Sequence, residues 1–389
     1  MTPLLLLALA VLQPPVPVAT PLRVSSLAFS PDRARLAIVH GERNKPGKLI
    51  VRDTKTGTIS WTLDQPVAVV QFSTDGSKLF VGASTLLVLD ATSGKQLAEC
   101  KHESNVTAIA VGPEDRFATA AGDRIVRVWD GKTFAELIKT QSIREAISGL
   151  SFSTDGNRLA GTHQSVIQLP DRKTTISSYL WNAHTGQELR TFDDSSFAIA
   201  GVAFSQDGSF LIRCILNTGE LTIHDAVTGE EISRLGSRSG IDRFAFSPHA
   251  GLAVTSGSFE VILTLYSFRF EKPTTNEKVR IQSLIAQFDS DAVADREAAA
   301  KSLFEFGFVA EPFLKQAMTD SPSAEIRLRT RKALIEWRSK GYKRIKLASS
   351  RTTALAISPD GSQVAWGVAD GTVRIINLKS EKVDREWKP

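Results

Sequence analysis

The chain is poor in cysteine, with only Cys100 and Cys214 among its 389 residues. Because these two lie far apart in the sequence, they exclude a cysteine-rich disulfide scaffold and a zinc site made of cysteines alone. Both are expected to act as small apolar packing residues. The six histidines are scattered without the spacing of metal ligands, so neither a metal nor a cofactor is predicted.

The sequence also lacks the short motifs that mark common catalytic sites. It contains no GxSxG, no HExxH, no GxxxxGK followed by Ser or Thr, and no GxGxxG after a strand. Three aspartates, Asp289, Asp291 and Asp295, are close enough in sequence to gather a calcium ion. They flank the start of an expected helix, however, and are interpreted as capping residues. No catalytic residue is predicted, and the chain is not expected to be an enzyme.

Long apolar runs are missing too. The run 4–12 has nine apolar residues, whereas a membrane-spanning helix needs about 20. Nine is typical of the core of a secretory signal peptide, so residues 1–20 are expected to form one. The mature chain is then expected to be exported, to the periplasm, the cell envelope or the medium, without a transmembrane segment. The alternative is a cytoplasmic protein.

What the sequence does contain is a repeat of about 42 residues. In each copy an alternating apolar strand is followed by a turn of the type Ser-x-Asp-Gly and then by a second strand. The turns begin at Ser30, Ser73, Gly112, Ser153, Ser205, Ser247 and Ser358. Their aspartates are predicted to be structural residues that bond back to the backbone. The clearest of them are Asp75, Asp155, Asp207 and Asp360.

Each repeat continues with a third apolar strand and a fourth, more polar one. Seven repeats of four strands predict a mainly β chain, a seven-bladed β-propeller. The propeller is assigned to residues 24–268 and 342–388, and the 269–341 segment is left as an insertion.

A Trp-Asp pair, Trp129 and Asp130, ends the third strand of one repeat, and Asp123 and Asp370 stand at the tight turn before the third strand in two repeats. By these residues the chain resembles the WD-repeat (G-beta repeat) β-propeller family over almost all of residues 24–388. The resemblance implies a rigid disc that binds other proteins. It also implies that Asp123 and Asp370 belong to a side-chain tetrad that braces a blade, although the Gly-His pair that often opens such repeats is missing.

Helical periodicity replaces the strand pattern in the 269–341 insertion. It predicts helices over 275–288, 292–306, 310–318 and 321–337, the last one capped by Ser321 with Pro322 at its first position. The segment interrupts the sixth blade between its third and fourth strands, and it resembles the HEAT-like helical insertions of exported bacterial propellers. Because both its ends belong to one turn, the helices are expected to lie on the face of the Ser-x-Asp-Gly turns. Their removal is expected to leave the propeller folded.

Positive charge gathers at the end of the insertion, where 322–346 holds nine Lys and Arg residues against two Glu. The candidate partner-binding residues are predicted to point away from the apolar stripe of the last helix. They are Arg327, Arg329, Arg331, Lys332 and Arg338. Such a surface suits an acidic protein or another anionic surface, and the alternative is a solvated face that keeps the helices soluble. No aromatic side chains alternate with the arginines, so nucleic acid is not the expected partner.

The sequence thus predicts a non-catalytic protein–protein interaction scaffold, without naming its partners. Two alternatives stay open. One is a ligand-binding or hydrolytic propeller, with a site at the mouth of the central channel made of polar residues that occur once rather than in every blade. The other is electrostatic binding of the basic helix to an anionic surface or nucleic acid.

Overall fold

The computed structural model describes residues 23–41, 47–143, 145–163, 176–194, 199–216, 218–236, 240–257, 262–268, 273–340, 342–346 and 351–388, without the side chains of 176–177, 193–194 and 337–340. The expected signal peptide at 1–20 lies outside these residues.

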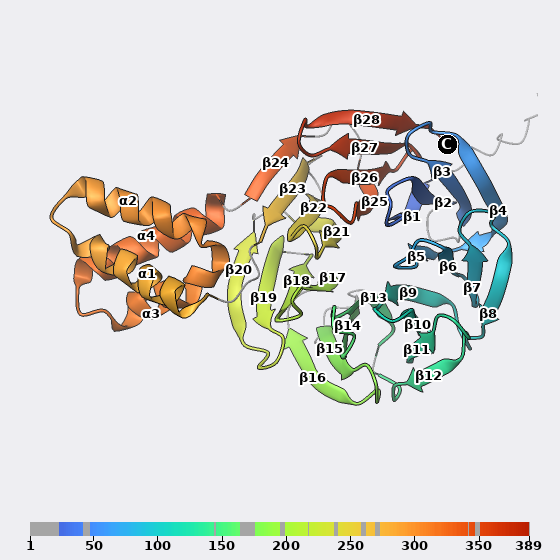
Figure 1. Cartoon of the computed structure of the whole chain (residues 1–389), viewed down its shortest axis with the longest axis horizontal. Coiled ribbons are helices and arrows are strands. Elements are labelled where there is room, and N and C mark those ends of the chain that lie inside the picture. Colours follow the sequence, from blue (N-terminus) through green and yellow to red (C-terminus); the bar gives the residue numbers. More distant parts are fainter. Residues whose placement is uncertain are drawn as a thin grey trace, which may run out of the picture.

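The described strands form seven four-stranded antiparallel sheets, which stand as blades around a ring (Figure 1). Blade 1 contains β1 (Arg23–Phe29), β2 (Arg35–Gly41), β3 (Gly47–Asp53) and β4 (Ile59–Val67). Blade 2 contains β5 (Val69–Phe72), β6 (Lys78–Gly82), β7 (Leu86–Asp90) and β8 (Gln96–Cys100). Blade 3 contains β9 (Val106–Val111), β10 (Arg116–Ala121), β11 (Val126–Asp130) and β12 (Glu136–Lys139). Blade 4 contains β13 (Ile147–Phe152), β14 (Arg158–His163), β15 (Ile176–Asn182) and β16 (Glu188–Asp194).

The remaining blades follow the same order, with the first strand at the centre and the fourth at the rim. Blade 5 contains β17 (Ile199–Phe204), β18 (Phe210–Ile215), β19 (Glu220–Asp225) and β20 (Glu231–Gly236). Blade 6 contains β21 (Ile241–Ser247), β22 (Leu252–Gly257), β23 (Ile262–Ser267) and β24 (Tyr342–Lys346). Blade 7 contains β25 (Thr352–Ile357), β26 (Gln363–Val368), β27 (Val373–Asn377) and β28 (Lys382–Trp387). The predicted seven-bladed propeller is confirmed.

The turn between the first two strands shows why the repeat is so regular. In blade 2 the Ser73 hydroxyl donates a 2.6 Å hydrogen bond to Asp75, which also accepts the N–H of Ser77 at 3.0 Å, and Gly76 takes a φ of 71°. The hydroxyl bond lowers the pKa of Asp75 to about 2. The corresponding serines donate in the same way to Asp155, Asp207 and Asp360.

The arginine that begins the second strand joins several blades to the next one. Its guanidinium donates to the glycine carbonyl of the neighbouring turn, in the pairs Arg35–Gly76 (2.9 Å), Arg116–Gly156 (3.1 Å) and Arg158–Gly208 (2.8 Å). A local turn motif is thereby linked to the assembly of the ring.

The ring closes between blades 7 and 1 through side-chain packing, since each of these blades takes its four strands from one continuous stretch of chain. Val24 and Leu36 of blade 1 share an apolar cluster with Ala365 and Val373 of blade 7. The sequence did not show how this closure is made.

The insertion leaves blade 6 between β23 and β24, as predicted. Residues 273–340 form the helices α1 (Thr275–Ala286), α2 (Val293–Glu305), α3 (Glu311–Asp320) and α4 (Ala324–Lys340), with short 3-10 helices at Gln287–Asp289 and Gly307–Ala310. The predicted cap of the last helix is wrong by two residues. The hydroxyl of Ser323 accepts the N–H of Ile326 at 3.2 Å, whereas that of Ser321 accepts the N–H of Ser323 at 3.3 Å.

The helices lie beside the rim of the ring, in contact with β20 of blade 5, and they do not cover a face of the disc as expected (Figure 1). Phe308 packs edge-on against Phe210 of blade 5, with ring centroids 5.3 Å apart. The Ser233 hydroxyl of β20 donates to the buried carboxylate of Glu311. Blades 5 and 6 and the insertion therefore share one apolar core. Excising the insertion would expose apolar residues of blades 5 and 6, so the deletion would cost stability, and a folded ring without the insertion stays a prediction.

Candidate functional site

Helix α4 carries the residues selected from the sequence, and one side of it is buried against the rest of the insertion. Thr330 is fully buried, and Ala333 and Leu334 are each 7% exposed. Together with the half-buried Ile326 they follow the helical period. The orientation of α4 is fixed by this side, so the opposite side faces solvent.

Arg327 has a local structural role. Its guanidinium donates to the carbonyl oxygens of Ser321 and Pro322 at 2.6 and 3.0 Å, just before α4 begins. Arg296 of α2 makes the same bonds to Ser290 and Asp291, at 2.6 and 3.1 Å. The α1–α2 and α3–α4 hairpins are therefore built alike. Before each of these two helices stands an Asp-Ser pair, and the arginine follows it at the same spacing in both. This repeated spacing indicates the role of the arginine, and the sequence reasoning missed it.

The other selected cations are placed differently from one another. Arg329 donates to Glu325 one turn earlier at 2.6 Å, which offsets its charge. Arg331 and Lys332 are exposed, and neither is ion-paired to another side chain that the structure describes. Arg338 belongs to α4, but its side chain lies outside the described residues. The unpaired basic surface is thus centred on Arg331 and Lys332.

Two exposed aliphatic residues flank this pair. Leu328 is 49% exposed and Ile335 is 63% exposed, one turn before and one turn after the two cations. The spacing i, i+3, i+4, i+7 puts all four side chains on one stripe. We call Leu328, Arg331, Lys332 and Ile335 the α4 face. Sequence reasoning found its charges but not its apolar ends, because only the packing of the insertion decides which aliphatic residues stay outside.

The aspartates at the start of α2 do not gather around a common point. Asp289 accepts a 2.8 Å bond from Ser323, Asp295 accepts one from Ser290 at 3.0 Å, and no side chain caps α2. The N-cap residue of α2 is Ala292, so the prediction that the three aspartates cap this helix is wrong at the N-cap position. Within the described ranges, no group of three or more His, Cys, Asp or Glu side chains could hold a metal ion.

Blade 3 contains a brace of side chains, of which sequence reasoning missed Thr119 and His102. The indole of Trp129 donates to the Thr119 hydroxyl at 2.8 Å, and that oxygen lies 2.8 Å from Nε2 of His102. Asp123 pairs with Arg127 at 2.8 Å and accepts the N–H of Ile125, as Asp370 accepts that of Thr372. His102 takes the place of the histidine in the Gly-His pair of the family, although the residue before it is Lys101 and not glycine. Asp130 accepts backbone N–H groups of the following turn.

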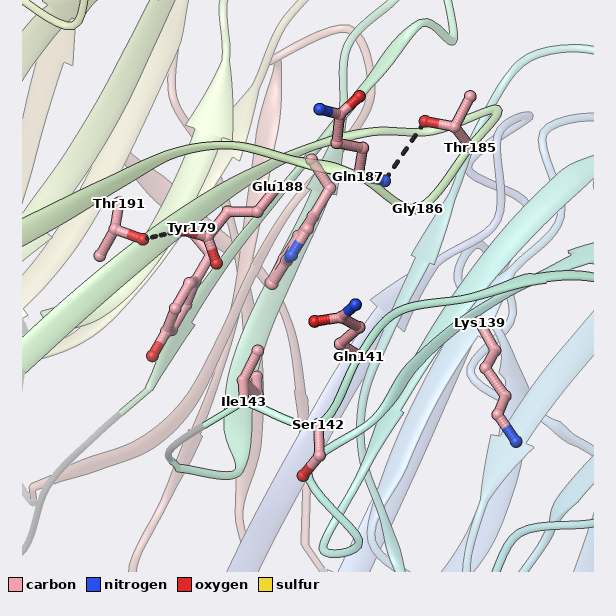
Figure 2. Close-up of a pocket in the computed structure, with 11 residues that line it drawn as sticks. Lys139, Gln141, Ser142, Ile143, Tyr179, Thr185, Gly186, Gln187, Glu188 and Thr191 are labelled. Atoms are coloured by element: carbon pink, nitrogen blue, oxygen red, sulfur yellow. Dashed lines mark hydrogen bonds between the residues drawn. The ribbon is translucent and has the colours of Figure 1, made fainter.

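A cavity of about 880 Å³ opens on the rim between blades 3 and 4 (Figure 2). Gln141, Gln187 and Glu188 line it, with Thr191 bonded to Glu188 at 2.6 Å. Tyr179, which also lines it, is only 5% exposed, so the cavity offers no open aromatic platform.

The central channel, about 520 Å³, is lined by the innermost strands. Small residues, among them Ala108, Gly149, Gly201 and Ala356, alternate in its wall with larger apolar ones such as Phe244. In the part of the chain that the structure describes, no helix is long and apolar enough to span a membrane.

Comparison with known proteins agrees with this architecture. Residues 94–130, the unit that contains the His102 brace, match the family model described as WD domain, G-beta repeat. The whole chain is similar to a chain of the solved structure described as "Crystal Structure of Mitotic Checkpoint Complex", with a TM-score of 0.62 and 16% identity over 97% of this chain and 99% of that one. The chain therefore has the seven-bladed propeller fold of WD-repeat proteins, with one repeat recognisable by sequence.

Proposed function

We propose that this protein is a non-catalytic interaction scaffold in which the propeller is the rigid platform and the α4 face is the recognition element. The observation that carries the proposal is the pairing of two exposed cations with two exposed aliphatic side chains on one stripe of a helix whose other side is buried. Apolar anchors supply binding energy, and the charges select the partner.

The chemistry of the α4 face specifies the partner. A surface that buries Leu328 and Ile335 must itself be apolar there, and it must place acidic groups opposite Arg331 and Lys332. An amphipathic acidic helix of another protein fits both requirements. The solvated-face alternative explains the cations. What favours binding over it is that Leu328 and Ile335, 49% and 63% exposed, lie on the same stripe as the two cations.

The way the insertion is attached supports a role as a fixed binding element. Its core is continuous with blades 5 and 6, and Lys315 donates to the carbonyl of Ile232 in β20 at 2.9 Å. A helix held in this way loses little conformational entropy when a partner binds. The equivalent bonds of Arg296 and Arg327 in the two hairpins also support the resemblance to HEAT-like repeats.

The test is affinity capture from the native organism, read by quantitative mass spectrometry with the full chain as bait. The variant Arg331→Glu/Lys332→Glu is expected to lose at least 10-fold of a specific partner, because it replaces two attractions by two repulsions. Leu328→Ser/Ile335→Ser should lose the same partner. Lys278→Glu/Lys301→Glu, which changes exposed lysines of α1 and α2 by the same total charge, is the matched control.

Three outcomes would reject the proposal: no specific partner, equal loss in the control, or loss in the charge variant alone with a steep dependence on salt. The last would favour simple electrostatic adsorption to an anionic surface.

We also infer that the chain is exported, with residues 1–20 as its signal peptide. The support is the short apolar run 4–12 followed by prolines and small residues. N-terminal sequencing of the native protein should find a start near residue 20, and recovery of Met1 on the mature protein would refute the inference.

A further inference from the structure

Charged residues break the regularity of the ring at one mouth of the central channel. The innermost strands of blades 6, 7 and 1 are β21, β25 and β1. Every innermost strand ends at its Ser-x-Asp-Gly turn and therefore starts on the opposite side of the disc. Asp242 and Arg243 lie at the start of β21, Arg351 directly precedes β25, and Arg23 is the first residue of β1. Adjacent packing of these strands brings the four residues to the same mouth.

Arg243 is singular among the seven blades. Counted back from the turn, its counterparts are Ser26, Val69, Ala108, Gly149, Gly201 and Ala354, all uncharged and most of them small. The strand register supports this alignment, because a bulge falls at Asp242 and at its counterparts Ser25, Ser148, Ala200 and Thr353. A residue that serves the blade architecture recurs from blade to blade, whereas Arg243 does not.

Hydrogen bonds fix the Arg243 guanidinium across the mouth. Its Nε donates to the carbonyl oxygen of Thr353 in blade 7 at 2.6 Å, and its Nη1 donates to the carbonyl oxygen of Asp242 at 2.8 Å. Arg351 reaches back from blade 7 and pairs with the Asp242 carboxylate at 2.8 Å. Arg351 is 58% exposed at its side chain and Asp242 is 14% exposed, so Arg351 lies on the solvent side of the pair.

The cluster carries more positive than negative charge. Of its four side chains three are guanidinium groups and one is a carboxylate, a net charge of +2. Arg243 is exposed to solvent at one side but packed against neighbouring residues at the other, and the resulting desolvation lowers its pKa. The charges of Arg351 and Arg23 lower it further, against the opposing effect of Asp242. Converging guanidinium groups with incomplete compensation attract an anion.

We propose that Arg23, Arg243 and Arg351 form a binding site for an oxyanion group, a carboxylate or a phosphate, at the channel mouth opposite the Ser-x-Asp-Gly turns. Guanidinium groups present their donors in a planar fork that matches both groups. The channel of about 520 Å³ begins beside Phe244 and Leu355, next along the same strands, and leaves room for the rest of a ligand that carries the anion. This site is independent of the α4 face.

The test is calorimetric titration of the full chain with inorganic phosphate and, separately, with acetate, at constant ionic strength with chloride as the balancing anion. Saturable binding to one site is expected for at least one of them, and the tighter anion identifies the group. Arg243→Gln should weaken binding about 10-fold or more through loss of a charge-assisted bond. Asp242→Asn should strengthen it several-fold, because a competing negative charge is removed.

Arg33→Gln is the matched control. Arg33 pairs with Asp360 at 2.7 Å on the opposite face of the ring and is similarly exposed, so its variant should bind as the wild type does. If Arg243→Gln does not fold, Arg351→Gln replaces it, since that side chain is largely in solvent. No saturation by either anion, or equal weakening in Arg33→Gln, would overturn the proposal.

Discussion

The attachment of the helical insertion to the propeller can be tested at a single residue, Phe308. This side chain is 3% exposed and lies in the shared core, where its ring meets Phe210 of blade 5 and Phe268 after β23 edge-on, with centroid distances of 5.3 and 6.2 Å. Phe308→Ala removes these contacts and leaves a cavity, at a cost of about 3–5 kcal/mol for a buried phenylalanine. The cost falls mainly on docking, because the lost contacts join the two parts.

The expected result is that the insertion opens from blade 5 far more often while the ring stays folded. A cost of about 3–5 kcal/mol corresponds to roughly two to three and a half orders of magnitude in the opening equilibrium. Hydrogen exchange followed by mass spectrometry should show this increase in α3 and β20, with protection retained in blades 1 to 3. Val279→Ala, at a side chain that is 61% exposed in α1, is the control and should change stability by no more than about 0.5 kcal/mol.

An increase below about 10-fold in α3 and β20 would refute the reasoning, because Phe308 would then not hold the two parts together. Uniform loss of protection in all seven blades would refute it differently. It would mean that the ring and the insertion unfold as one cooperative unit, so that no separate docking step exists.

Three further predictions concern the propeller. Arg158→Ala removes the 2.8 Å bond to the carbonyl of Gly208 in the next blade, and urea denaturation should show a loss of about 1–2 kcal/mol; an unchanged midpoint would contradict that role. His40 is 7% exposed, and burial lowers its pKa to about 4 from 6.5. Between these two pH values the His40 imidazole is protonated in the unfolded chain but not in the folded one. Its contribution to stability is therefore complete above pH 6.5 and is lost as the pH falls toward 4, and the melting temperature of His40→Gln should depend less on pH over this window than that of the wild type. Burial raises the pKa of the thiols of Cys100, to about 11, and Cys214, so a thiol reagent should label neither in the native protein at pH 8 and both in denaturant; rapid native labelling would disprove their burial.

The propeller was predictable from the sequence because its determinants are local. A serine, an aspartate and a glycine within four residues close each turn, as at Ser73, Asp75 and Gly76, and alternating apolar residues form the strands on both sides. Such signals recur with every blade, so even degenerate copies support one another. The brace of His102 was missed because a search for the pair Gly-His does not find a histidine that is preceded by a residue other than glycine.

The candidate sites were only partly predictable. The charge of Arg331 and Lys332 is visible in the sequence, but the bonds that commit Arg327 to a helix start depend on backbone geometry. The position of the insertion beside blade 5 depends on contacts such as that of Glu311 with Ser233, which are far apart in the chain.

The sequence by itself determined the number of blades, the place where the insertion enters blade 6 and the helices within it, because periodicity and turn chemistry act over a few residues. Only the tertiary structure decided how the ring closes, which side of α4 faces solvent and which charged residues meet at the channel mouth. Asp242, Arg351 and Arg23 come from three blades and from both ends of the chain. Their meeting follows from the closure of the ring, a long-range property that no local pattern encodes.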